Sequence, residues 1–284
     1  MNVQTQTSLL KIISKTLDFF LELYIPISNQ HMKIYRSILS LLLIVLTFHV
    51  ATAQQSKIIT QLLELKANGY QADRDIAGMD PYYGLKKLIY GNNRFADGKS
   101  ENPRQTPGDL KAFESGQKPF ATIVGCSDSR VPNEIIFDQG VGDLFITRTA
   151  GQVMAQASYG TIEFGVEVLK SNLIVVLGHQ SCGAVFAAMA LPPNPPGHVV
   201  TLINAIKPAA LRAKAEGLPE KETLDLAIKE NVLEQVYMLR SLEPVLSRRV
   251  DEGTLIIVGA VYNLENGTVE FIEETITSLS KFNK

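Results

Sequence analysis

Residues 120–130, Phe120-Ala-Thr-Ile-Val-Gly-Cys-Ser-Asp-Ser-Arg130, join a short apolar run to a cluster of chemically active side chains. A second run of the same kind, Leu173-Ile-Val-Val-Leu-Gly178, precedes His179-Gln-Ser-Cys182. Short apolar runs that end at glycine and are separated by helix-like sequence are typical of buried parallel strands. The sequence therefore predicts an α/β fold in which both runs are strands of one sheet.

The flanking sequence predicts the other elements. Further strands are expected at 143–147, 255–262 and 268–272, the last returning from a hairpin turn at 264–267 as an antiparallel edge strand. Helical spacing of apolar residues predicts helices over 56–67, 81–95, 131–137, 183–190, 199–216 and 222–249, with a helix-rich crossover at 151–169. We therefore expect a mostly parallel sheet of about four strands plus an antiparallel edge strand, flanked by helices and preceded by an N-terminal helical arm.

The two active clusters are expected to meet. Ligands of open α/β sheets gather beyond the carboxyl ends of the strands, so neighbouring strands would bring Cys126, His179 and Cys182 together. Two thiolates and an imidazole are typical zinc ligands. A fourth protein ligand would have to be His198, which follows a Pro- and Gly-rich stretch at 191–197 and is poorly placed to act as a rigid ligand. Three protein ligands with a fourth position open to water are typical of catalytic zinc.

Asp128 and Arg130 lie directly after the first of these candidate ligands. A carboxylate there can accept the hydrogen of a metal-bound hydroxide and orient it, or it can bind the metal and close the site. The guanidinium of Arg130 can hold Asp128 by paired hydrogen bonds and keep it away from the metal. The sequence leaves both arrangements open.

These motifs resemble those of the β-class carbonic anhydrases, whose pattern is Cys-x-Asp-x-Arg followed by His-x-x-Cys. The resemblance continues through 131–140, 142–151 and 160–164, and it covers roughly residues 80 to 275. It implies one Zn²⁺ per chain, held by Cys126, His179 and Cys182. It also implies reversible hydration of carbon dioxide to bicarbonate and a proton by zinc-bound hydroxide, with Asp128 and Arg130 as catalytic residues.

The resemblance further implies a homodimer or a dimer of dimers, in which N-terminal helices pack across the partner and the dimer completes the active site. It suggests three substrate-pocket residues: Gln139, near the family's pocket glutamine, Phe164, where many members have tyrosine, and Gly183. Because Phe164 lacks the tyrosine hydroxyl, a proton-relay role is not expected there. The chain has no tryptophan, so the accessory bicarbonate site that uses one is not expected either.

Two alternatives to carbon dioxide hydration remain at this point. The same site could hydrolyse carbonyl sulfide or carbon disulfide. The chain could instead be a non-catalytic module in which zinc, or a disulfide between Cys126 and Cys182, joins two loops; an oxidising compartment would allow that disulfide.

The N-terminal region predicts export. Residues 32–53 combine a basic start, an apolar core at 38–48 and the small residues Ala51-Thr-Ala53, which is the layout of a secretory signal peptide. We expect residues 1–31 to be an upstream extension outside the fold. Residues 54–284 would form a single catalytic domain, with the helical arm at 54–100. Cleavage near Ala53 would leave a periplasmic protein; an uncleaved leader that anchors the chain to the membrane is the alternative.

Composition narrows the range of partners. The chain carries 27 basic and 29 acidic residues, a formal net charge of −2, and has no basic run. This balance does not favour nucleic acid. The apolar core of the leader is too short for a comfortable membrane span, so no stable span is expected in the mature protein. A small-molecule substrate, carbon dioxide or bicarbonate, is the expected partner.

Overall fold

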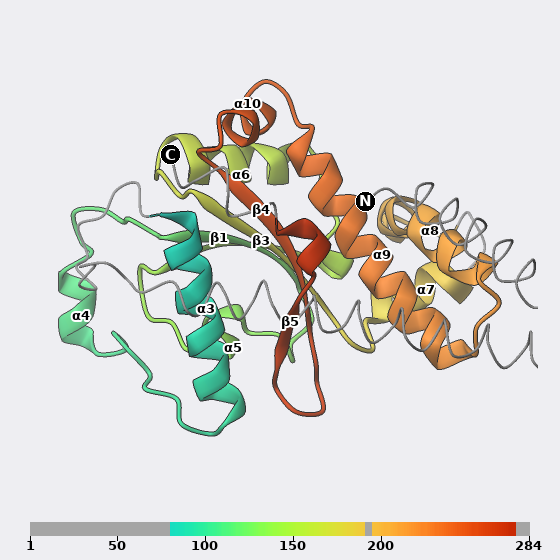
Figure 1. Cartoon of the computed structure of the whole chain (residues 1–284), viewed down its shortest axis with the longest axis horizontal. Coiled ribbons are helices and arrows are strands. Elements are labelled where there is room, and N and C mark those ends of the chain that lie inside the picture. Colours follow the sequence, from blue (N-terminus) through green and yellow to red (C-terminus); the bar gives the residue numbers. More distant parts are fainter. Residues whose placement is uncertain (1–79, 191–194, 277–284) are drawn as a thin grey trace, which may run out of the picture. The chain divides into compact units, whose positions relative to one another are not determined.

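The computed structural model describes residues 80–190 and 195–276 (Figure 1). The predicted upstream extension (1–31), the signal peptide (32–53) and the part of the helical arm before residue 80 lie outside the described residues. The single-domain boundaries, the cleavage site and the periplasmic location therefore stay predictions. Among the helices that are described, none combines the length and the apolar character needed to cross a bilayer.

The described chain forms one five-stranded sheet in the order β2-β1-β3-β4-β5. The first four strands are parallel and the fifth is antiparallel to β4, as the sequence predicts. The strands are β1 (Ala121–Cys126), β2 (Leu144–Thr149), β3 (Leu173–His179), β4 (Ile256–Tyr262) and β5 (Val269–Phe271). Every residue of β1 and β3 is buried, which explains their continuous apolar sequence.

The order of the strands places a switch point between β1 and β3. The chain leaves β1 for β2 on one side and then crosses back to form β3 on the other side, with Gly125 paired to Leu177. Crevices at such points are the usual ligand sites of open α/β sheets. Both strands continue one residue further than the sequence predicts, so Cys126 and His179 are the last residues of β1 and β3.

Helices cover both faces of this sheet. The α-helices are α3 (Pro81–Ala96), α4 (Pro107–Lys111), α5 (Asn133–Ile136), α6 (Gln156–Glu167), α7 (Gly183–Ala190), α8 (Val199–Ala215), α9 (Glu220–Arg240) and α10 (Leu246–Asp251), and the 3-10 turns are η1 (Ala150–Gln152) and η2 (Glu273–Thr275). The prediction of one helix over 222–249 is wrong. Two helices occupy that region, with Pro244 between them. Proline lacks the N–H that a helix interior needs, and its ring clashes with the preceding turn.

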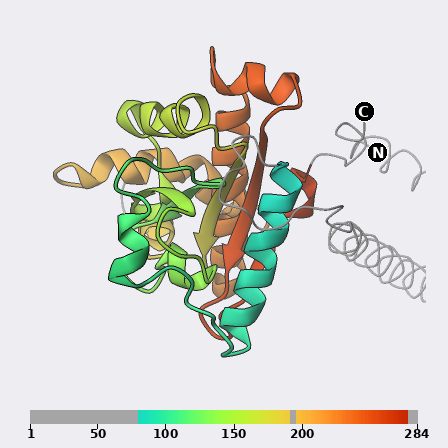
Figure 2. The same cartoon turned by 90° about the vertical axis from the view of Figure 1, so that its left-hand side faces the viewer.

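The helix α9 packs closely against the sheet on the face it shares with α6. Val176 and Ile257 of the sheet lie in one buried cluster with residues of both helices. Gly259 makes the close approach possible, because a Cβ there would lie 2.7 Å from a methyl carbon of Val232. The helix α3 covers the opposite face (Figure 2). There its Gly84 lies against Leu173. The close contact brings the middle of α9 near the carboxyl ends of the strands.

One lysine on α3 is expected to lower the stability of the fold at neutral pH. Burial, together with the charges of Arg104 and Arg94, lowers the pKa of Lys87 to about 8, and its ammonium lies 4.2 Å from the centroid of the Phe120 ring. Between about pH 8 and its unfolded value near 10.4, only the unfolded chain keeps this proton. The cost of burying the charge is therefore complete below pH 8 and disappears as the pH rises toward 10.4.

We expect Lys87→Met to raise the melting temperature at pH 7, and this gain to shrink as the pH rises through 8. Thermal unfolding of variant and wild type at several pH values tests it. Lys86→Met is the matched control, because the Lys86 ammonium lies 5.6 Å from the Tyr90 ring on the same helix. A lower melting temperature for Lys87→Met at pH 7 would show that the contact with Phe120 outweighs the cost of burial.

Candidate metal centre

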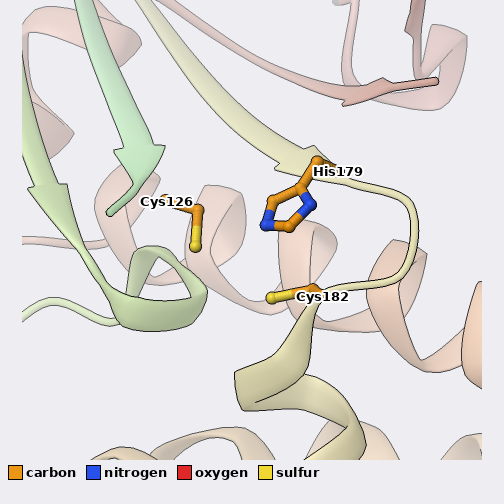
Figure 3. A group of neighbouring side chains, drawn as sticks. All are labelled: Cys126, His179 and Cys182. Carbon is orange, nitrogen blue, oxygen red and sulfur yellow. The ribbon is translucent and has the colours of Figure 1, made fainter. Parts of the chain in front are cut away.

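The carboxyl ends of β1 and β3 bring the three predicted ligands together. Cys126 ends β1, His179 ends β3, and Cys182 directly precedes α7; their side chains point toward one another (Figure 3). The candidate ligand atoms all lie within 4.8 Å of one another, and all three residues are buried. The two motifs predict that these three side chains meet, and the structure confirms that they do.

The imidazole of His179 is oriented as a metal ligand. Its Nδ1 lies 2.8 Å from the carbonyl oxygen of Gln180, so Nδ1–H donates to that oxygen and Nε2 keeps its lone pair. This Nε2 atom is buried and has no hydrogen-bond partner among the described residues. A buried nitrogen without a partner is costly, and a metal ion would satisfy it. In many metal sites, the ring nitrogen of a histidine that does not bind the metal donates to a backbone carbonyl, as Nδ1 of His179 does here.

The two cysteine side chains share one proton. Hydrogen bonding from Cys182 lowers the pKa of Cys126, and burial opposes this effect. The pKa of Cys182 is raised, because it keeps the proton that stabilises Cys126. The backbone N–H of Gly151 also donates to Cys126 Sγ at 3.3 Å. Thiolate is the form that binds zinc, so binding would release the proton that Cys182 keeps. Two sulfur ligands and one nitrogen ligand suit this ion.

Asp128 lies beside the ligands and is held by Arg130. Nε and Nη2 of Arg130 donate to Oδ1 and Oδ2 of Asp128 at 2.9 and 2.8 Å, and the backbone N–H of Arg130 donates to Oδ1. These bonds hold the pKa of Asp128 well below its usual range. Oδ2 of Asp128 is 3.8 Å from His179 Nε2. Of the two arrangements that the sequence leaves open, the structure has the one in which Asp128 pairs with Arg130.

Arg130 also joins the two halves of the centre. Its Nη2 donates to the carbonyl oxygen of Ser181 at 3.3 Å, in the loop between His179 and Cys182. Movement of either loop would therefore disturb the pairing with Asp128.

Arg148 is a residue that the sequence analysis does not identify. It lies in β2, and its Nε and Nη2 donate to the carbonyl oxygens of Cys126 and Asp128 at 2.7 and 2.6 Å. These two bonds fix the backbone of the loop that carries the first ligand. The sequence offers one signal: Arg148 directly follows the strand predicted at 143–147, so it is at the same edge of the sheet as Cys126.

The three predicted pocket residues are not gathered at the centre. Only Gly183 is adjacent to a ligand, and a Cβ added there would meet open space. Gln139 is buried and donates to the carbonyl oxygen of Phe137. Phe164 of α6 is 46% exposed and packs against Phe145 of β2, which lies four residues, or about 13 Å, before the carboxyl end of that strand. Pocket roles for Gln139 and Phe164 stay predictions.

A comparison with protein families identifies the chain. The carbonic anhydrase family model matches residues 121–269, which include all three ligands, Asp128 and Arg130. The chain belongs to the β-carbonic anhydrase family. It is accordingly an enzyme, a carbonic anhydrase, as the motifs predict.

Relatives of this carbonic anhydrase support the assignment over most of their length. Carbonic anhydrase 2 of Mycobacterium tuberculosis is 42% identical over 191 residues, 66% of this chain and 91% of the relative. A carbonic anhydrase of Mycolicibacterium smegmatis is 39% identical over 194 residues, 67% of this chain and 93% of the relative.

Solved structures of β-carbonic anhydrases share the fold. That of CafA from Aspergillus fumigatus matches with a TM-score of 0.55 and 26% identity, over 70% of this chain and 99% of the other. One of the tetrameric enzymes of Sordaria macrospora matches with a TM-score of 0.54 and 25% identity, over 67% and 95%.

Proposed function

We propose that this β-carbonic anhydrase binds one Zn²⁺ per chain through Cys126, His179 and Cys182 and hydrates carbon dioxide reversibly to bicarbonate and a proton. The observation that supports it most directly is the convergence of three zinc-type ligand atoms within 4.8 Å, with Asp128 beside them but held by Arg130. Three protein ligands leave a coordination position for water, as in catalytic zinc sites.

The residues around the centre have different roles in the proposed reaction. When bound, zinc would act as a Lewis acid and lower the pKa of a coordinated water to about 7. Asp128 stays ionised at neutral pH because Arg130 holds it, so it can only accept hydrogen bonds. Asp128 Oδ2 lies 3.8 Å from His179 Nε2, so the carboxylate would accept a hydrogen bond from the attacking oxygen and orient it toward the carbon of carbon dioxide. Arg130 acts through Asp128, by fixing the carboxylate.

Zinc content and stopped-flow hydration of carbon dioxide, measured on the purified protein from about pH 6.5 to about pH 9, test this proposal. We expect one zinc per chain and activity across the range. Zinc with activity only at high pH would indicate that Asp128 leaves Arg130 and closes the site at neutral pH. Zinc without any hydration would contradict the proposed substrate and direct assays to carbonyl sulfide and carbon disulfide. A protein with neither zinc nor free thiols would support the disulfide module.

We also propose that the protein assembles as a homodimer or a dimer of dimers. The edge strand β2 is only partly buried in the single chain, and the similar Sordaria macrospora enzymes are described as tetrameric. Light scattering on the zinc-loaded sample measures the assembly directly, and a mass corresponding to one chain would contradict the proposal.

A further inference from the structure

Gly151 contacts both the metal centre and α9 through its backbone. Its N–H donates to Cys126 Sγ at 3.3 Å, and its carbonyl oxygen accepts a hydrogen bond from Asn231 Nδ2 at 3.0 Å. Gly151 belongs to the short 3-10 turn η1, and Asn231 lies in the interior of α9. Gly151 therefore links α9 to a sulfur atom of the candidate metal centre.

The conformation of Gly151 requires glycine. Its φ of 65° lies in the left-handed region, where a side chain is strained. A Cβ would also lie 2.7 Å from Ile206 Cδ1 and 3.1 Å from the Cβ of Ala184. The lack of a side chain lets η1 fit against α7 and α8. It also leaves Gly151 without side-chain contacts, so its orientation depends on bonds to its backbone.

Asn231 is an unusual residue for its place in the helix. It is fully buried, and its neighbours Ile228 and Val232 pack in apolar clusters. A buried amide is costly unless it is hydrogen-bonded. Its Nδ2 atom donates to Gly151, whereas its Oδ1 atom has no partner among the described residues. Among the described residues, the bond to Gly151 is thus the one hydrogen bond that the Asn231 side chain makes.

We propose that Asn231 is a positioning residue of the metal centre, which orients Gly151 so that its N–H donates to the sulfur of Cys126. The inference rests on the proposed function in one respect, that Cys126 binds the metal. An N–H donor held toward a ligating thiolate fixes its lone pairs and reduces its charge. Mutation of a hydrogen-bond partner of a metal ligand typically lowers metal affinity or activity by about 10- to 100-fold.

Asn231→Leu tests the proposal, because it keeps a similar volume and removes the donor. We expect the affinity for zinc, measured by competition with a chromophoric chelator, to fall by about tenfold or more. In the cobalt-substituted protein, the sulfur-to-metal charge-transfer band should move to longer wavelength, since the sulfur loses a donor. Asn231→Ala, which also lacks the donor, should shift both readouts in the same direction.

Gln235→Leu is the matched control. Gln235 is also a buried amide on α9, one turn after Asn231, and its Oε1 has no partner among the described residues. We expect this variant to change the melting temperature but neither the zinc affinity nor the cobalt band. Equal losses of zinc affinity in the two leucine variants would show a general packing effect and overturn the proposal.

Wild-type zinc affinity in Asn231→Leu or in Asn231→Ala would overturn it as well. If neither variant folds, Asn231→Ser decides by the same measurements, because it is smaller and its hydroxyl is too short to replace the amide. The proposed reaction is tested separately. A wild-type protein that binds zinc but does not hydrate carbon dioxide would contradict the proposed function and leave the role of Asn231 intact.

Discussion

Replacement of His179 by alanine is expected to abolish zinc binding and to lower kcat/KM for carbon dioxide hydration by at least about 10³-fold. Nε2 of His179 is the buried nitrogen that faces the two sulfur atoms, and no other histidine among the described residues belongs to the group. Two thiolates alone make an incomplete zinc site. Zinc content by elemental analysis and stopped-flow hydration on the same sample measure both effects.

His198→Ala is the matched control, because His198 is exposed and lies at the start of α8, outside the ligand group. It should retain zinc and, in strong buffer, nearly all steady-state activity. A His179→Ala protein that still holds one zinc per chain and is active would show that another residue completes the site. A large loss in His198→Ala that added imidazole restores would identify His198 as a proton carrier.

Asp128→Asn is expected to lower kcat by roughly 10²- to 10⁴-fold while the zinc content stays unchanged. The substitution keeps the size of the side chain, so the loop should keep its shape. It removes the charge that makes Asp128 a pure acceptor, and an NH₂ group, which donates, replaces one of the two oxygens. Stopped-flow kinetics together with zinc analysis separate a loss of catalysis from a loss of metal.

Arg130→Ala extends this experiment. Because Arg130 is expected to act through Asp128, the double variant should be little worse than Asp128→Asn alone. Asp225→Asn serves as the control for a carboxylate in a surface ion pair, here with Lys221, and should leave kcat unchanged. Loss of zinc in Asp128→Asn would show that the carboxylate is a ligand, and full activity would remove it from the mechanism.

The sequence predicts the sheet and the cluster of candidate ligands well because both depend on local signals. Continuous apolar runs mark β1 and β3 as buried strands, and chemically active residues at their ends follow from the geometry of parallel sheets. The family resemblance, now confirmed, adds the parallel register that puts the two ends together.

The residues that the sequence does not reveal act through contacts between distant segments. Asn231 lies 80 residues from Gly151, and its sequence neighbours give it the pattern of an ordinary amphipathic helix. Arg148 contacts carbonyl oxygens, so only its position directly after a predicted strand indicates where it lies. The break between α9 and α10 could have been predicted, because Pro244 stands inside the apolar spacing that suggested one continuous helix.

The strand order has a consequence for how the protein matures. Cys126 is synthesised before β2, and the other two ligands follow only after the crossover that places β3 on the opposite side of β1. The nascent chain therefore holds no complete binding site until β1 and β3 have paired. If the three residues bind a metal ion as proposed, its uptake would be a late step of folding, and the free energy of binding would add to the stability of that pairing. Availability of the ion would thus set how much of the newly made chain reaches its final form.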